Sequence, residues 1–199
     1  MKKFELTNEF VTNMFGTKLF RIRALVEFGD VEAGELGGYV EKESNLGHDD
    51  NAWVYGDAQV FGDALVYGNA RVYDNAWVYG NAWVYGNARV CGDAWVCGDA
   101  LVCGDALVCG NARVCSDEDY AYAHGFGSVN RTTTFFRLKD GGVGVRCGCF
   151  YGTLAQFRDK IRETHGETKK AQEYLMLADL MELRFEEDEN EVGNRKYVE

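Results

Sequence analysis

The chain has no proline, and its 199 residues include only three histidines and four methionines. Without proline, its turns depend on residues that tolerate positive φ, namely the 24 glycines together with Asn and Asp. It also lacks an apolar run of about twenty residues, which a membrane-spanning helix requires, and Met1–Thr12 lacks the pattern of a signal peptide. These absences lead us to expect a cytoplasmic protein built from short turns.

Basic residues are scarce relative to acidic ones. The chain has 21 Lys and Arg against 32 Asp and Glu, which gives a net charge of −11. Proteins that bind nucleic acids or membrane surfaces in a general way use clustered Lys and Arg side chains. We therefore expect neither membrane association nor general nucleic-acid binding.

What the chain has in abundance is one six-residue unit, repeated eleven times without interruption over residues 51–116. Each copy reads Asn or Asp, Ala, a variable residue, Val, an aromatic residue or Cys, and in most copies Gly. Such units bury their apolar residues only against their neighbours, so the repeat predicts a solenoid. Alternate side chains of an extended segment point to opposite faces, and the variable position includes arginines. Ala and Val are therefore predicted to face inward.

The unit, read from its valine as V-Y-G-D-A-x, resembles the hexapeptide repeat of left-handed parallel β-helix proteins. This resemblance implies three hexads per triangular coil, with coils about 4.8 Å apart. Residues eighteen positions apart would then stack on three outer faces. The three expected ladders are Trp53, Arg71, Arg89 and Leu107; Gln59, Trp77, Trp95 and Arg113; and Leu65, Trp83 and Leu101. Soluble monomers seldom expose such large apolar patches, so we expect flanking domains and sister chains, most simply in a homotrimer, to cover them.

The flanking sequences predict two further structural units. Alternating apolar residues before the repeat predict a β cap with strands at Lys3–Leu6 and Gly16–Phe28. After the repeat, a hairpin turns at Lys139–Gly142, between strands at Thr132–Leu138 and Val143–Phe150, and helices follow at Thr153–Thr164 and Glu167–Phe185. The expected fold is mainly β, with an N-terminal β cap at 1–50, the β-helix at 51–116, a transition at 117–128, an α+β domain at 129–186 and a disordered acidic tail at 187–199.

Residues able to support catalysis or metal binding are few and scattered. His48, His124 and His165 lie outside the repeat, and His124 beside Asp117–Asp119 is the one arrangement that could supply a general base. The Cys147-Gly148-Cys149 spacing lacks a second Cys or His pair to complete four metal ligands, so packing of these two thiols is the simpler interpretation. We therefore expect no metal, no cofactor and no enzymatic activity.

Five of the seven cysteines occupy repeat positions that hold Tyr or Phe in earlier copies. That register marks them as packing equivalents of the aromatic residues, and in the cytoplasm we expect them to be reduced thiols. They are Cys91, Cys97, Cys103, Cys109 and Cys115.

Guanidinium groups and aromatic planes recur together on the expected outer faces. Such pairs suit a base stacked on a ring and a phosphate held by two N–H groups, although the same residue types are also enriched at protein interfaces. The candidate ligand-binding residues on the repeat are Arg71, Arg89, Tyr73, Trp77 and Trp95, and a second candidate anion site near the hairpin comprises Arg131, Arg137 and Arg146.

The flanks look like those of hexapeptide-repeat proteins encoded by bacteriophages and prophages. The segments that carry this resemblance are F-R-I, G-E-L-G-G-Y-V-E, T-T-T-F-F-R, C-G-C-F-Y-G-T and T-H-G. The resemblance implies a viral accessory protein in the cytoplasm of a bacterial host. We expect a non-enzymatic counter-defence protein that sequesters a host immune nucleotide or a host defence protein. The alternatives are a structural scaffolding module and a hexapeptide-type acyltransferase.

Overall fold

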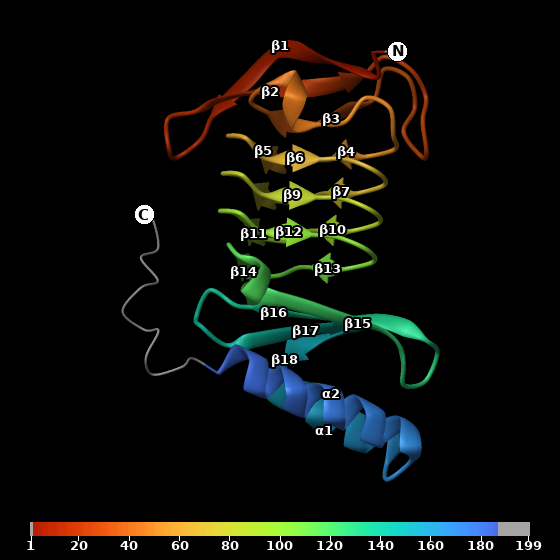
Figure 1. Cartoon of the computed structure of the whole chain (residues 1–199). Helices are drawn as coiled ribbons and strands as arrows, with labels where there is room; N and C mark the ends of the chain where they lie inside the picture. The colour runs from red at the N-terminus through yellow and green to blue at the C-terminus, as the bar shows by residue number, and fades with distance from the viewer. Residues whose placement is uncertain (1, 187–199) are drawn as a thin grey trace.

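A computed structural model describes residues 2–186. The chain forms three tiers, with an N-terminal sheet at one end, a stack of coils in the middle, and a C-terminal sheet backed by two helices at the other end (Figure 1). In the described part of the chain, no helix combines the length and apolar character needed to span a membrane.

The coils form a parallel β-solenoid, as the repeat predicts. Each six-residue unit contributes one two-residue strand that ends at its valine. The strands are β4 (Trp53–Val54), β5 (Gln59–Val60), β6 (Leu65–Val66), β7 (Arg71–Val72), β8 (Trp77–Val78), β9 (Trp83–Val84), β10 (Arg89–Val90), β11 (Trp95–Val96), β12 (Leu101–Val102), β13 (Leu107–Val108) and β14 (Arg113–Val114). Strands eighteen residues apart pair in parallel, in the orders β4-β7-β10-β13, β5-β8-β11-β14 and β6-β9-β12. The three predicted ladders are therefore confirmed.

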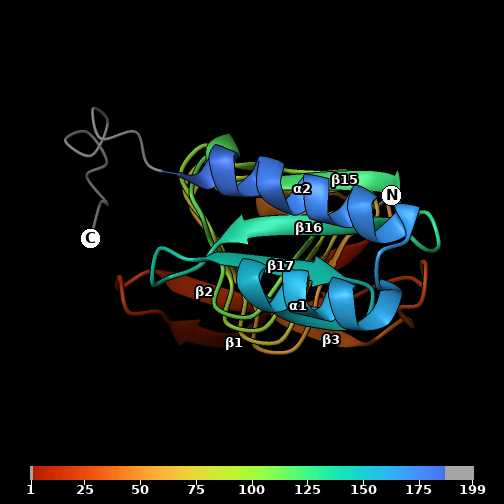
Figure 2. The same cartoon turned by 90° about the horizontal axis from the view of Figure 1, so that it is seen from below.

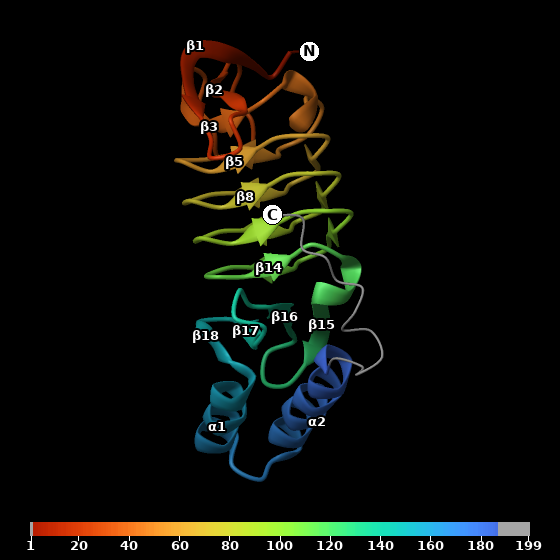
Figure 3. The ribbon, with the colours of Figure 1, turned by 90° about the vertical axis from the view of Figure 1, so that its left-hand side faces the viewer.

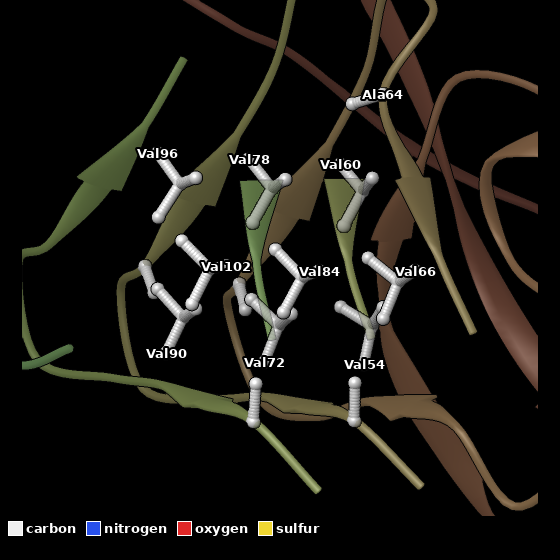
Figure 4. Close-up of a cluster of buried hydrophobic side chains, with 14 of the residues drawn as sticks. Val54, Val60, Ala64, Val66, Val72, Val78, Val84, Val90, Val96 and Val102 are labelled. Atoms are coloured by element: carbon white, nitrogen blue, oxygen red, sulfur yellow. The ribbon is translucent and has the colours of Figure 1, made fainter. Parts of the chain in front are cut away.

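The core of the solenoid consists of the Ala and Val side chains of the repeat, each at most 1% exposed. Valines of successive coils stack and point toward a common centre (Figure 4). Between the strands, residues with positive φ turn the chain at the corners; most are glycines, such as Gly80 at 71°, and one is Asp74 at 62°. A Cβ at Gly62 would lie 3.1 Å from the backbone of Gly80 in the next coil, so close coil stacking also favours glycine here.

The N-terminal tier is an antiparallel sheet of β1 (Phe4–Thr12), β2 (Lys18–Ala24) and β3 (Leu36–Val40). β1 extends well beyond the predicted Lys3–Leu6 strand. A short 3-10 helix, Glu43–Asn45, lies between β3 and the first coil. β3 also pairs in parallel with β5, so the solenoid sheet continues into the cap. Trp53 points out of its coil but is fully buried, because cap residues Phe4 and Phe28 pack edge-on against it.

The C-terminal tier is an antiparallel sheet in the order β15 (Tyr120–Phe126), β16 (Arg131–Arg137), β17 (Val143–Cys147) and β18 (Phe150–Thr153). A second 3-10 helix, Asp117–Asp119, precedes it. The predicted hairpin corresponds to β16 and β17. The sequence interpretation missed β15, within the expected transition, and β18, because their pattern of alternation is weak. The predicted acidic tail at 187–199 lies outside the described residues.

The C-terminal sheet lies between the last coil and the two helices (Figure 3). It separates two apolar clusters. On one face, Tyr120 and Phe136 join the core of the coils. On the other, Phe135 and Val145 pack under α1 (Leu154–His165) and α2 (Lys169–Phe185). Seen from below, the two helices lie across this second face (Figure 2). One face of the C-terminal sheet thus covers the end of the solenoid, and the other packs against the two helices.

Candidate functional site

The structure places the candidate residues of the repeat on two different sides of the solenoid. Arg71 and Arg89 lie on the β4-β7-β10-β13 sheet, whereas Trp77 and Trp95 lie on the β5-β8-β11-β14 sheet. No single surface therefore combines the two arginines with the two tryptophans.

Arg71 is held by the N-terminal cap. Its Nη1 and Nη2 donate to the two carboxylate oxygens of Asp30, each at 2.7 Å, and the Tyr55 hydroxyl donates to the same carboxylate. Burial raises the pKa of Asp30, but the hydrogen bonds from Arg71 outweigh it and leave that pKa below its ordinary value. Burial also raises the pKa of Tyr55 to about 12. This ion pair joins the cap to the coils and occupies the Arg71 guanidinium.

The tryptophan ladder is also occupied within the chain. Trp77 and Trp95 stack in parallel with ring centroids 5.0 Å apart. Arg113 lies over Trp95 at 3.2 Å from the ring centroid, and its burial lowers its pKa. At the other end of the column, Phe15 of the β1–β2 turn packs edge-on against Trp77. The column therefore has protein side chains both above and below it.

Arg89 is exposed and lies beside a pair of stacked thiols. A hydrogen bond with Cys109 lowers the pKa of Cys91 to about 7, with a further contribution from Tyr73, and the pKa of Cys109 is raised by the same bond and by burial. Burial, with a hydrogen bond to Cys91, raises the pKa of Tyr73. Tyr73 is therefore engaged with the thiols of its own ladder.

The expectation that all five repeat cysteines are reduced is wrong for one pair. Cys97 and Cys115 are joined by a disulfide across one coil. In-register stacking places their Cα atoms 4.3 Å apart, which brings the sulfur atoms together. Cys91, Cys103 and Cys109 are free thiols, as are Cys147 at the end of β17 and Cys149 in the β17–β18 turn.

The three hairpin arginines have different environments. Arg137 is 6% exposed and donates to the backbone oxygens of Gly141, at 3.3 Å, and Phe185, at 3.2 Å. Its guanidinium also lies 5.4 Å from the Phe185 ring centroid and 3.9 Å from the Asp119 carboxylate. Arg137 thus fixes the end of α2 against the sheet and is not available to a ligand.

Arg131 and Arg146, in contrast, line one cavity of about 470 Å³. This cavity, which we call the wedge, lies between the last coil and the coil-facing side of the C-terminal sheet. Its volume falls within the usual range for small-molecule sites. The coil contributes Asp105 and Leu107, and the sheet and its turns contribute Val129, Arg131, Thr132, Thr134, Arg146 and Gly148.

The wedge exists because the C-terminal sheet does not continue the coil register. The Leu107 backbone N–H donates to Thr134 Oγ1 at 3.0 Å instead of to another strand. Among residues 2–186, antiparallel backbone contact between the two tiers consists of the Ala112–Leu138 bridge and a bond from the Lys139 N–H to the Asn111 oxygen. The sheet therefore meets the coils along one side and leaves a gap along the other.

The electrostatics of the wedge favour an anion. Within residues 2–186, no carboxylate forms an ion pair with Arg131 or Arg146. The Arg146 Nε is buried and has no hydrogen-bond partner among the described residues. The one acidic lining residue, Asp105, already accepts a bond from Asn87 Nδ2 at 2.9 Å. The guanidinium groups of Arg131 and Arg146 and the hydroxyls of Thr132 and Thr134 thus line the same cavity.

Catalytic and metal-binding arrangements find less support. His124 Nδ1 bonds to Thr132 Oγ1 at 2.9 Å, so its partner is a hydroxyl that lines the wedge. Asp119 accepts from the backbone N–H groups of Cys115 and Ser116 and closes the last coil. The described residues hold no group of three or more His, Cys, Asp or Glu placed to bind a metal ion.

The sequence interpretation singled out Arg131 and Arg146 as part of a candidate anion site, but not Thr132 and Thr134, which line the same cavity. The T-T-T-F-F-R alternation does place Thr132 and Thr134 on one face of β16, and Thr134 pairs with Arg146 across the hairpin. The sequence could not show that these threonines line the cavity, because that depends on which tier this face of β16 contacts. Gly148 was missed for a similar reason: a Cβ there would overlap Arg131 Nη1, so its small size allows Arg131 to reach the opening.

The comparisons with known proteins agree with the architecture of the coils. A family model described as the YdcK beta solenoid repeat matches residues 58–72, 66–80, 70–86 and 82–98. Over these overlapping stretches the chain is similar to a β-solenoid repeat, and the matches end before the residues that form the wedge. No curated protein matches the chain.

Proposed function

We propose that this β-solenoid protein captures an anionic, base-containing small molecule, such as a nucleotide, in the wedge. The observation that supports this proposal most strongly is the convergence of Arg131 and Arg146 without acidic partners in the described chain, one of them with a buried, unsatisfied Nε. An unpaired buried polar group costs about 1–3 kcal/mol, which a bound anion would recover. A phosphate is the group best matched to two guanidinium forks and neighbouring hydroxyls.

The biological setting that we propose rests on the resemblance to left-handed hexapeptide-repeat proteins of phages. In that setting, a rigid, non-enzymatic binder would remove a host immune nucleotide from the cytoplasm of the infected bacterium. A host defence protein with an acidic surface is the second candidate ligand, because the same two arginines would contact it. A scaffolding role would not account for the convergence of Arg131 and Arg146.

Self-association is the second part of the proposal. On the β6-β9-β12 face, Trp83 is 44% exposed and Leu101 is 37% exposed, while Tyr67 and Tyr85 stack at 5.0 Å. Neither cap covers this face as the N-terminal cap covers Trp53, and a homotrimer would bury it. Light scattering should therefore give a mass of three chains at micromolar concentration, and a mass of one chain at every accessible concentration would overturn this part.

Calorimetry with a panel of cyclic and linear nucleotides tests the binding proposal. Arg131→Ala combined with Arg146→Ala should weaken the binding of the tightest nucleotide by at least about tenfold, because hydrogen bonds to charged groups contribute about 1.5–3 kcal/mol each. Added salt should weaken the wild-type affinity.

The matched control is Arg23→Ala combined with Lys42→Ala. It removes the same charge from exposed surface pairs with Glu5 and Asp63, at the opposite end of the solenoid from the wedge. The control should bind like wild type. An absence of heat with every nucleotide, or equal affinities for the two double variants, would contradict the proposal.

A further inference from the structure

A second cavity lies on the opposite face of the C-terminal sheet, under the two helices. It has a volume of about 300 Å³, at the lower end of the range for small-molecule sites. Arg131 lines this cavity, which we call the helix-side pocket, as well as the wedge. The turn that contributes Gly148 to the wedge contributes Cys149 to the helix-side pocket. Arg131 therefore lies between the two cavities at the end of the sheet.

The wall of the helix-side pocket is aromatic. The Phe150 and Phe157 rings lie 5.4 Å apart, Phe157 meets Tyr174 edge-on at 5.8 Å, and His165 stacks on Tyr174 at 5.9 Å. Phe150 and His165 are partly exposed, so their rings are accessible from the pocket. Aromatic planes of this kind hold flat, uncharged rings by stacking.

The aromatic wall is held in place before any ligand binds. The Tyr174 hydroxyl accepts from the Ser128 N–H at 3.2 Å, which ties α2 to the β15–β16 turn. Below it, Cys147 Sγ accepts from Thr133 Oγ1 at 3.2 Å. Phe157 is almost completely buried in the helix-side core. A ligand entering here would meet a preorganised surface, which lowers the entropic cost of binding.

The rim of the helix-side pocket is cationic. Arg131 and Lys160 are exposed at its edge. Lys160 pairs with Glu163 at 2.8 Å, but both side chains are exposed, so the pair contributes little and can rearrange. An aromatic wall with a cationic rim matches a flat ring that carries an anionic group.

We infer that the helix-side pocket is the base subsite for the ligand of the wedge. The aromatic base of a nucleotide lies against Phe150 and His165, and its phosphate contacts Arg131 and reaches Arg146 around the end of the sheet. This inference rests on the proposed function and deepens it, because it identifies the ligand class as a phosphorylated aromatic base. Inorganic pyrophosphate and sugar phosphates without a base would occupy only the arginine part.

The test compares three probes by calorimetry: the tightest nucleotide of the panel, ribose 5-phosphate and inorganic pyrophosphate. Phe150→Leu combined with His165→Leu keeps the pocket apolar but removes both accessible rings. This variant should lose about tenfold in nucleotide affinity and keep the wild-type affinity for the two base-free probes. Arg146→Ala should weaken all three. Phe10→Leu, an exposed aromatic change at the far end of the molecule, is the control and should bind like wild type.

The outcomes separate the inference from the proposal on which it rests. If the wild-type protein binds ribose 5-phosphate as tightly as the nucleotide, or if the double leucine variant keeps its nucleotide affinity, the base subsite is wrong while the anion site stands. If none of the three probes binds the wild-type protein, both are wrong. A photoreactive azido-base nucleotide gives an independent readout: its label should map to 147–165 or to Tyr174, and labelling of the coils alone would overturn the inference.

Discussion

The two ends of the solenoid are capped by different kinds of side chain. Between coils, N–H groups donate to carbonyls of the following coil, as in Trp53 N to Ala70 O and Trp77 N to Ala94 O. Both ends nevertheless present N–H groups and carbonyls to their caps: Gly62 N and Gly68 N donate to cap carboxylates at the first coil, and Leu101 O accepts from the Tyr120 hydroxyl at the last coil. We call the first end, where side-chain donors of the cap bind coil carbonyls, the carbonyl end, and the last end, where side-chain acceptors bind coil N–H groups, the amide end. Each end needs a cap with both donors and acceptors.

At the carbonyl end, cap side chains supply donors, together with the Glu41 and Asp50 carboxylates, which accept from Gly62 N and Gly68 N. Lys3 Nζ donates to the oxygens of Asp50 and Ala52, and Asn45 Nδ2 donates to those of Gly62 and Ala64. Backbone N–H groups of β3 complete this layer as β3 pairs with β5. The cap thus continues the solenoid backbone and leaves Trp53 fully buried.

At the amide end, most side-chain bonds to the coil are made by acceptors, and the Tyr120 hydroxyl also donates to Leu101 O at 2.6 Å. Leu101 N donates to Asp117 Oδ1, Cys103 N to the Tyr120 hydroxyl and Leu107 N to Thr134 Oγ1. Side-chain acceptors do not require the next tier to lie in register, so the C-terminal sheet can meet the coils at an angle. The wedge follows from that geometry.

The contrast between the two ends indicates where a solenoid protein of this type can place a binding site. Both ends carry an arginine near the junction, but Arg71 at the carbonyl end is neutralised by Asp30, whereas Arg131 and Arg146 have no acidic partner in the described chain. We therefore interpret the carbonyl end as structural and the amide end as the binding end.

The largest expected effect comes from removing the buried aromatic residue at each end. Trp53→Ala and Phe136→Ala should each lower the free energy of unfolding by about 3–5 kcal/mol, because both side chains are fully buried against the coils. Chemical denaturation checks this. Similar losses at the two ends would show that the ends differ only in their polar capping groups. If Phe136→Ala lowered the free energy of unfolding by less than about 1 kcal/mol, the C-terminal sheet would not be stabilising the end of the solenoid.

The repeat made the middle of the molecule predictable. A fixed period together with the parity of extended segments determines which residues stack and which side faces inward, so the positions of Ala88 or Trp95 required no tertiary information. The hairpin was equally local, since Lys139–Gly142 is a strong turn signal between two alternating segments.

The environments of the arginines could not be predicted, because they depend on contacts between residues that are far apart in the sequence. Arg71 meets Asp30 across 41 residues, and Arg137 meets the Phe185 oxygen across 48. Parity places Arg131 and Arg137 on the same side of β16, yet Arg131 reaches the wedge because it lies at the strand end beside Gly148. Only the placement of the sheet against the coils distinguishes these environments.

The smallest expected effect concerns the ion pair at the carbonyl end. Asp30→Asn should cost up to about 1 kcal/mol at neutral pH, since the Asp30–Arg71 pair is largely exposed. Because the pKa of Asp30 is lowered in the folded state, its stabilisation is present above the ordinary carboxyl pKa of 3.8 and is lost as the pH falls through the lower folded value. Thermal melts of wild type and variant should therefore converge in acid. A constant difference down to the lowest accessible pH would indicate a role that does not depend on charge.

The most direct test of the central claim is a crystal structure of the protein with the nucleotide that gives the largest heat. The account predicts a phosphate within hydrogen-bond distance of Arg131 and Arg146, at the amide end of the solenoid. Arg71 should remain paired with Asp30, and the Trp77–Trp95 column should stay covered by Phe15 and Arg113. A nucleotide bound on the tryptophan column or at the carbonyl end, with the wedge empty, would contradict it.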